Sequence, residues 1–187
     1  MRLDDLAGLR FNYDVVGSTR HDETPQGYHR LENRSRLGTG DVVYARAGAA
    51  LLHWRMHRAA GLPMTATDTP PVIGTNALGR LGAGFLAGRL RTMTPLSLAG
   101  LPVPVRVVWT VDEPDRIGFG YGTLEGHPSS GEESFVVTRE AEGIYFTVRA
   151  YSRPGTWYTR LGGPAARKAQ EYAARRYATA LRRLSSP

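Results

Sequence analysis

The stretch IGFGYGTLEGHPSSGEESF, residues 117–135, decides the fold because it joins two apolar, alternating segments through a polar corner. In its first half Ile117, Phe119 and Tyr121 alternate with glycines, which predicts a strand with one bare face. A bare face lets a sheet curve, or lets another group pack against the strand backbone. The second half gathers acidic side chains and a histidine where we expect the next strand to begin.

The segments on either side of this corner predict an antiparallel meander. Residues 103–112 alternate, and so do residues 134–138 and 144–152, with turn residues between successive segments. In the first of these segments we expect four side chains on one face: Val105, Val107, Trp109 and Val111. Residues 27–37 predict one more strand with a wet face.

Two helices are predicted around these strands. Asp41 is placed as the N-cap of a helix over about 42–60, and Gly61 and Pro63 end it. Pro164 begins a long final helix. An apolar stripe of mostly small residues runs along that helix, formed by Ala166, Ala169, Ala173, Tyr177, Ala180 and Leu184. Gln170 lies at the edge of the stripe, where it needs either a backbone partner or a cavity to point into.

This order of elements predicts an α+β fold in which a curved antiparallel β-sheet wraps around the long C-terminal helix, a helix-grip-like arrangement with a pocket between the two. We expect residues 1–187 to form a single domain. The middle segment, 62–104, is the least regular. Residues 72–78 suit a strand there, and Gly79, Gly82, Gly84 and Gly88 suit either a flap beside the pocket or a surface loop.

Composition excludes several classes of function. The 187 residues include no cysteine, so disulfides and thiolate chemistry are ruled out. No apolar run reaches the length of a membrane span and no signal peptide is apparent, which predicts a cytoplasmic protein. The net charge of +7 raises the question of nucleic acid. Its arginines are spread out apart from a group on the final helix, so we expect a solvated basic face and nucleic-acid binding remains the less favoured alternative.

Several segments resemble one known family. They are YGTLEGHPSSGEESF (121–135), FTVRAYSRPGTW (146–157), GGPAARKAQEYAARRYATAL (162–181), YDVVGSTR (13–20) and the long run from Pro25 to Arg58. Together they look like the domain of unknown function family 1990, also called uncharacterised protein family 0548, over nearly the whole chain. The resemblance implies a single-domain protein similar to the helix-grip superfamily. It carries no catalytic residue over to this chain.

The polar corner supplies the candidate catalytic residues His127, Glu132 and Glu133, with Glu125 beside them. A histidine and carboxylates at one place suit proton transfer. Two ligands on one loop are too few for a metal site. The alternative is a purely structural role, in which the residues form a turn whose carboxylates cap backbone N–H groups or pair with arginines. Alternation predicts that one of Glu132 and Glu133 faces inward and the other outward.

Candidate ligand-binding residues follow from the aromatic and polar side chains around the predicted sheet and final helix. They are Trp109, Tyr121, Glu125, Arg149, Tyr151, Arg153 and Gln170. Aromatic residues there suit a core as well as a pocket, and Arg153 suits either a bound anion or an ion pair with Glu132 or Glu133. His53 and His57 have metal-ligand spacing on a helix, but we expect both on a solvated face.

These observations support three hypotheses on function. The first is binding of a small, largely apolar organic molecule between the sheet and the C-terminal helix. The second is a cofactor-free biosynthetic enzyme, a cyclase, dehydratase or isomerase, that uses the same cavity. The third is a nucleic-acid or partner-binding module that works through the basic helix. No cofactor or metal is predicted, and the sequence leaves the oligomeric state open.

Overall fold

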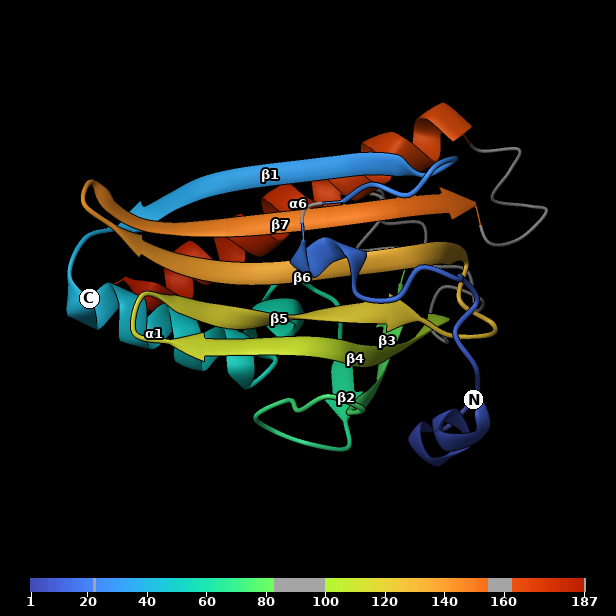
Figure 1. The fold of residues 1–187 in the computed structure, drawn as a ribbon. Helices are drawn as coiled ribbons and strands as arrows, with labels where there is room; N and C mark the ends of the chain where they lie inside the picture. Colours follow the sequence, from blue (N-terminus) through green and yellow to red (C-terminus); the bar gives the residue numbers. More distant parts are fainter. Residues whose placement is uncertain (22, 83–99, 155–162, 187) are drawn as a thin grey trace.

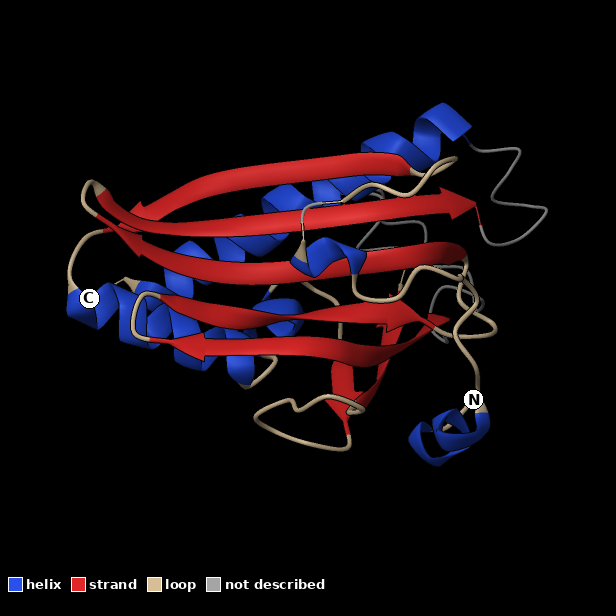
Figure 2. Ribbon diagram, in the orientation of Figure 1, coloured by secondary structure: helices blue, strands red, loops and turns tan. Residues whose placement is uncertain are grey.

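A computed structural model describes residues 1–21, 23–82, 100–154 and 163–186, and its main feature is an antiparallel sheet crossed by a long helix (Figures 1 and 2). The helical elements described are η1 (Leu3–Gly8), η2 (Ser18–Arg20), α1 (Asp41–Leu52), α2 (Arg55–Ala59) and α6 (Gly163–Ser185). The strands described are β1 (His29–Gly38), β2 (Met64–Ala66), β3 (Asn76–Leu81), β4 (Leu101–Glu113), β5 (Arg116–Thr123), β6 (Ser129–Glu140) and β7 (Gly143–Pro154). The α+β, helix-grip-like prediction is confirmed.

The sheet runs in the order β1-β7-β6-β5-β4-β3-β2, so the first strand pairs with the last. Every neighbouring pair is antiparallel, as the meander prediction requires. One expected boundary is wrong. β6 begins at Ser129 rather than at Ser134, because its ladder with β7 continues as far as Pro154. Glu132 and Glu133 therefore lie within a strand, not in the corner before it.

The two faces of the sheet have different covers. The inner face packs against α1, α2 and α6, and it carries the rings of Phe119, Phe135 and Phe146 in the main hydrophobic core. The outer face is crossed by the N-terminal segment that contains η2, which contacts β6 and β7 (Figure 1). Burial on the inner face supplies the main apolar driving force, since buried area scales with stabilisation at about 25 cal/mol per Å².

The helix predicted over 42–60 is broken in two. Trp54 takes a left-handed conformation, with φ of 56°, between α1 and α2. This break keeps the Trp54 ring buried against Phe119, with ring centroids 4.9 Å apart. The predicted cap is also wrong: Gly40 is the N-cap and Asp41 lies in the first turn, where its charge favours the helix dipole and pairs with Arg139.

A β-bulge in β4 changes the expected face of Trp109. Val107 pairs with Tyr121 and Trp109 pairs with Gly120, so Val108 is an extra residue. Trp109 therefore lies on the outer face, and the prediction that it shares a face with Val107 is wrong. Its indole fills the space left by the bare strand: a Cβ on Gly120 would lie 2.4 Å from Trp109 Nε1.

Two strands from the irregular middle of the chain, β3 and β2, lie at one edge of the sheet. The strand expected over 72–78 begins later, at Asn76, because residues 72–75 form a turn in which Thr75 N–H donates to the Val72 carbonyl. β2 is a further strand that the sequence did not indicate. The expected flap glycines Gly84 and Gly88 lie outside the described residues. At the other end of the chain, α6 begins at Gly163 and packs Ala174, Tyr177 and Leu181 into the core, close to the predicted stripe.

Candidate ligand cavity

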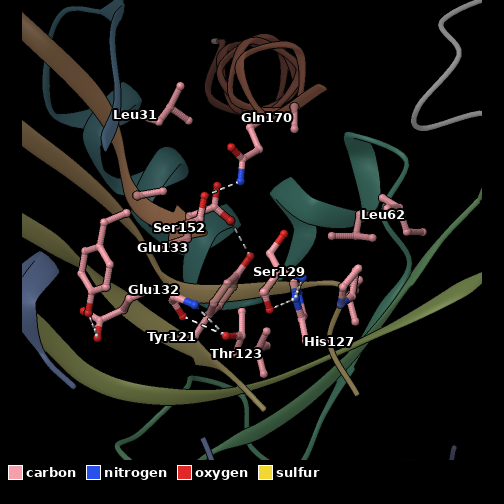
Figure 3. Close-up of a pocket in the computed structure, with 18 of the residues that line it drawn as sticks. Leu31, Leu62, Tyr121, Thr123, His127, Ser129, Glu132, Glu133, Ser152 and Gln170 are labelled. Atoms are coloured by element: carbon pink, nitrogen blue, oxygen red, sulfur yellow. Dashed lines mark hydrogen bonds between the residues drawn. The ribbon is translucent and has the colours of Figure 1, made fainter. Parts of the chain in front are cut away.

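A cavity of about 160 Å³ lies between the inner face of the sheet and α6 (Figure 3). Its walls are mainly apolar side chains, contributed by Leu31, Leu62, Met64, Leu81, Val103, Val105, Ala150 and Ala173. A few polar side chains interrupt them, and these are Tyr121, Thr123, His127, Ser129, Glu133, Ser152, Gln170 and Tyr177. Alternation along β1, β4 and β7 places the small and branched residues of these strands on the same side.

A buried carboxyl group is the main polar feature of the wall. Tyr121 on β5 pairs with Glu133 on β6, and the Tyr121 hydroxyl donates to Glu133 Oε2 at 2.9 Å. Tyr177 on α6 interacts with both residues from the opposite side. Burial raises the pKa of Glu133 to about 7, although the hydrogen bond from Tyr121 opposes this. The same burial, with the charge of Glu133, raises the pKa of both tyrosines, so they remain donors at neutral pH.

His127 reaches the same cavity from the loop between β5 and β6. The backbone N–H of Ser129 donates to His127 Nδ1 at 2.9 Å. The Ser129 carbonyl oxygen lies 3.0 Å from the same nitrogen, a contact that would need the ring proton on Nδ1. Because the amide nitrogen always carries its hydrogen and directs it at Nδ1, we assign the ring proton to Nε2. Burial lowers the pKa of His127 to about 4, so the ring is neutral at pH 7. The ring is thus a hydrogen-bond donor without a charge.

Gln170 on α6 finds a side-chain partner rather than a backbone one. Its Nε2 donates to Ser152 Oγ at 2.7 Å, and both residues line the cavity. This pair links the final helix to β7 across the cavity (Figure 3). The serine hydroxyl keeps its own proton free to donate, so the pair offers a neutral polar contact to whatever lies beside it.

Glu132 and Tyr151 also belong to the cavity wall, but their polar ends meet on the outer face. Glu132 accepts hydrogen bonds from the Tyr13 hydroxyl at 3.0 Å and from the Gly17 N–H at 2.7 Å. It also shares the single proton of the Tyr151 hydroxyl, 3.0 Å away, with the Val15 carbonyl at 2.6 Å. Thr19 adds its N–H at 3.0 Å and its hydroxyl. The expected division of Glu132 and Glu133 between the two faces is observed. Glu132 holds the N-terminal segment against the sheet.

Trp109 belongs to this outer network and not to the cavity. Its indole N–H donates to Thr19 Oγ1 at 2.9 Å, and the Thr19 hydroxyl in turn donates to Glu132. The side chain is almost fully buried. The structure therefore gives Trp109 a role in anchoring the N-terminal segment, in place of the ligand contact expected from the sequence.

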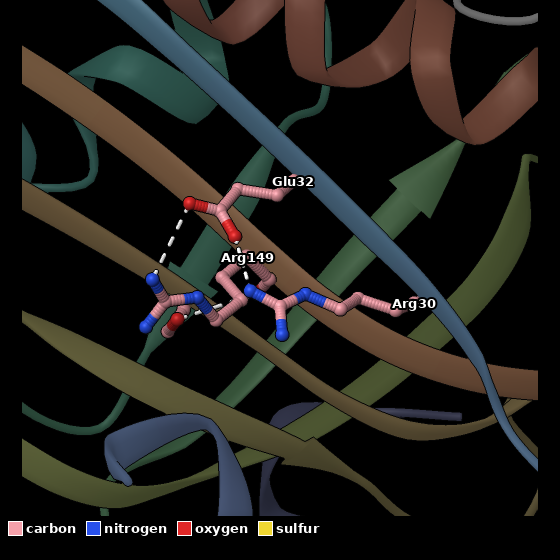
Figure 4. A network of polar contacts seen from close by, with 4 residues as sticks. Arg30, Glu32 and Arg149 are labelled. Carbon is pink, nitrogen blue, oxygen red and sulfur yellow. Dashed lines mark hydrogen bonds and ion pairs between the residues drawn. The ribbon is translucent and has the colours of Figure 1, made fainter. Parts of the chain in front are cut away.

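The predicted arginines point away from the cavity as well. Arg149 Nη2 lies 3.4 Å from Glu32 Oε1, and Arg30 pairs with the other oxygen of that carboxylate (Figure 4). Arg153 lies over the Tyr28 ring and 3.9 Å from Asp14. In the described part of the chain, the ion pairs of these two arginines go to Glu32 and Asp14 rather than to Glu132 or Glu133, contrary to the alternative weighed from the sequence.

Glu125 lies outside the cavity, near the N-terminus of the chain. Its Oε2 accepts from the Arg10 N–H at 3.2 Å, and its Oε1 lies 3.5 Å from Arg10 Nε. Its side chain is 45% exposed. These contacts continue the backbone pairing between residues 10–12 and the end of β5, where Glu125 N–H donates to the Arg10 carbonyl. They fit the structured-turn interpretation of this carboxylate.

His57 was expected in solvent, and this prediction is wrong. Its side chain is fully buried, with its ring 4.8 Å from the Phe135 ring and 5.2 Å from the Tyr177 ring, centroid to centroid. Both ring nitrogens lack a hydrogen-bond partner among the described residues. Burial lowers the pKa of His57 to about 3. The break at Trp54 rotates α2 relative to α1, so an unbroken helical wheel misplaced this residue. His53 does lie in solvent, with Nδ1 2.8 Å from the Ala49 carbonyl.

The described residues hold no cluster of three or more histidine or acidic side chains suited to a metal ion. None of their helices is both long and apolar enough to cross a membrane. The residues that sequence patterns missed, Tyr177 and Ser152 above all, lie on elements that were predicted. What was missing was the pairing across the cavity, which no local pattern reports.

Comparisons with known proteins agree on the family and the fold. The family described as "Domain of unknown function (DUF1990)" matches residues 12–180. A UPF0548 protein of Deinococcus radiodurans is 33% identical over 179 residues, covering 91% of this chain and 85% of its own. A UPF0548 protein of Arabidopsis thaliana is 32% identical over 184 residues, covering 88% and 82%. Relatives therefore occur in eukaryotes as well as in bacteria.

One solved structure extends the comparison to shape alone. Hypothetical protein jhp0584 of Helicobacter pylori matches 93% of this chain and 98% of its own with a TM-score of 0.54, at 9% identity. Such a low identity shows a shared fold and nothing about activity. With the family match over residues 12–180 and the relatives above 30% identity, the chain belongs to the DUF1990 family, which also carries the name UPF0548.

Proposed function

We propose that this protein binds a compact, largely apolar small molecule in the cavity between the sheet and α6. The observation that carries the proposal is a largely apolar wall with a few polar groups that converge on it, the usual make-up of a small-molecule site. At about 160 Å³ the space resembles an engineered cavity of about 150 Å³ that takes up benzene. We therefore expect a ligand body close to a six-membered ring in size.

The polar groups would orient such a ligand. Glu133 offers an acceptor, or a donor when protonated, and His127 offers an N–H. The Gln170–Ser152 pair offers a third, neutral contact. A ring with one or two polar substituents can use the remaining donor and acceptor capacity of these groups, which a pure hydrocarbon would leave unused.

Native mass spectrometry of protein purified from its own organism, compared with the same sample after denaturation, tests occupancy. A small molecule released on denaturation supports the proposal and gives its formula.

Ligand-observed NMR with cyclohexanone tests the size class of the ligand. Ala173→Leu should fill the cavity and abolish the NMR signal, while Ala49→Leu, on the exposed side of α1, should leave it unchanged. Equal binding by both variants would contradict a ligand in this cavity.

A cofactor-free enzyme is the second candidate, and Glu133 favours it. A carboxyl group whose pKa is raised to about 7 is suited to give and take protons near neutral pH.

The nucleic-acid alternative has weaker support. Arg175, Arg176 and Arg183 line a groove between α6 and the C-terminal end of α2. Binding of DNA or RNA there should weaken steeply with salt, and binding insensitive to salt would contradict it.

A further inference from the structure

Two groups of opposite chemical character face the cavity. The Glu133 carboxyl enters from β6, where among described residues it bonds only to Tyr121 and interacts with Tyr177. The His127 ring enters from the loop before β6, with Nδ1 beside the backbone N–H and carbonyl of Ser129 and with the ring proton assigned to Nε2. The cavity thus holds a carboxyl group with unused acceptor capacity and an uncharged N–H donor.

We propose that the cavity catalyses proton transfer on a small carbonyl compound, with Glu133 as the base and the His127 Nε2–H as the donor to the carbonyl oxygen. The proposal rests on the binding function proposed above. It specifies a substrate class: a compact ring or chain with an acidic C–H next to a carbonyl, and with a double bond one carbon further on.

Glu133, not its neighbour Glu132, has the required freedom. The Glu132 carboxylate already accepts five hydrogen bonds on the outer face, so a sixth partner would displace one of them. Glu133 accepts one hydrogen bond from Tyr121, which leaves its second oxygen for a substrate C–H. In the described part of the chain, neither arginine nor lysine forms an ion pair with Glu133, so no fixed cation weakens its basicity.

His127 supplies what an enolate needs. A neutral imidazole N–H stabilises a developing oxyanion without giving up its proton completely, and a preorganised donor of this kind contributes about 10²–10³ in rate. Burial lowers the pKa of His127 to about 4, which keeps the ring neutral at the pH where Glu133 is ionised. A carboxylate base together with a neutral histidine donor is an established combination for carbonyl isomerisation.

The reaction balances without a cofactor. Glu133 takes the proton from the carbon between the carbonyl and the double bond, so that C–H bond breaks. Its electron pair forms a new carbon–carbon double bond, and the carbonyl electrons move to the oxygen, where the His127 N–H holds them. The protonated Glu133 then gives the same proton to the far carbon of the original double bond, the carbonyl re-forms, and the product is the conjugated isomer.

Cyclohex-3-en-1-one is the probe, because its ring matches the cavity in size and its product, cyclohex-2-en-1-one, absorbs in the ultraviolet. The wild-type protein should bind the probe and convert it faster than buffer does. Glu133→Gln should lower the rate about 10²–10⁴-fold, the usual share of general acid–base catalysis. His127→Asn keeps an acceptor near Ser129 N–H but loses the Nε2 donor, and should lower the rate about 10²–10³-fold. Glu140→Gln on the surface is the matched control and should keep the full rate.

The outcomes separate this inference from the binding proposal. Binding of the probe seen by NMR, without isomerisation and without exchange of its α-protons in D₂O, overturns proton transfer and leaves the cavity function standing. Failure of both the probe and cyclohexanone to bind counts against both. A rate unchanged in Glu133→Gln, with that variant folded by circular dichroism, also overturns the inference.

The pH profile gives a second readout. The titratable groups around Glu133 are Tyr121 on β5, Tyr177 on α6, His127 in the same cavity wall, which is neutral above about pH 4, and, behind them, His57 on α2. Both tyrosines stay protonated and His57 stays neutral at neutral pH, since burial raises the pKa of the first two and lowers that of the third. The rate should therefore rise with pH through about 7, as Glu133 ionises. A rate that falls through this range contradicts Glu133 as the base.

Discussion

Glu132 and Glu133 are neighbours in sequence but belong to two different regions of the molecule. On the outer face, Glu132 is 2% exposed and holds five hydrogen bonds that pin the N-terminal segment to the sheet. On the inner face, Glu133 borders a cavity and accepts one hydrogen bond. A buried carboxylate is therefore available for chemistry only where the fold leaves its acceptor sites unfilled.

Replacing Glu132 by Gln is expected to give the largest effect. An amide NH₂ would face donors that now reach a carboxylate oxygen, and the charge that strengthens these bonds would be lost. Hydrogen bonds to charged groups contribute about 1.5–3 kcal/mol each, so the free energy of unfolding should fall by at least about 3 kcal/mol. Urea unfolding at pH 7 measures it. A loss of less than about 1 kcal/mol would mean that the outer network is not what holds the N-terminal segment.

At high pH, Glu133→Gln should instead raise the free energy of unfolding relative to the wild-type protein. The folded protein holds this proton up to about pH 7, whereas the ordinary pKa is 4.5. The stability that this proton contributes is therefore present at low pH and is lost as pH rises toward and through 7. At 1.36 kcal/mol per pKa unit, wild type should lose about 2–3 kcal/mol relative to Glu133→Gln between pH 5 and pH 8. Parallel stability curves for the two proteins would refute the raised pKa.

His57 should make the folded protein less stable at acidic pH, whereas Glu133 does so at high pH. Its pKa falls from an ordinary 6.5 to about 3, so the unfolded chain takes up this proton before the folded protein does. The stability linked to His57 is present above pH 6.5 and is lost as pH falls. Between pH 7 and pH 4.5, wild type should lose about 2 kcal/mol more than His57→Leu. Chemical denaturation at both pH values measures this, and an equal loss in both proteins would show that His57 finds a partner in solution.

The ion-pair network around Glu32 should give the smallest effect. Arg30 and Arg149 bind its carboxylate on the outer side of the sheet, and Arg30 and Glu32 are partly exposed (Figure 4). Surface pairs contribute about 0–1 kcal/mol and are screened by salt. Glu32→Gln should therefore cost less than about 1 kcal/mol, and less still in 1 M NaCl. A cost comparable to that of Glu132→Gln would show that exposure does not separate the two carboxylates.

Much of this architecture follows from the sequence alone. Alternation along residues 144–152 and 117–121 gave the strands and their inner faces, because a half-buried strand repeats every two residues. The small residues of the final helix indicated close packing on the sheet. The same period of two places Glu132 and Glu133 on opposite faces of their strand.

The remainder depends on events that a periodic pattern does not contain. The extra residue at Val108 reverses the alternation ahead of Trp109, and the left-handed Trp54 reorients His57. Both are single-residue interruptions, and each moved one ring from its expected face to the other. The partners of Glu132 come from residues 13–19, more than a hundred positions away in sequence, so local spacing could not identify them.

The bulge in β4 also determines which side chains of this strand line the cavity. Before Val108 the odd-numbered residues of this strand face inward, and Val103 and Val105 line the cavity. After it the odd-numbered residues face outward, as Trp109 does. In the same strand, the odd-numbered side chains thus face the cavity before the bulge and the outer surface after it. Adding or removing a single residue ahead of Val108 would exchange the valines of the cavity for Pro104 and Arg106, whereas substitution at fixed length reshapes the cavity one side chain at a time.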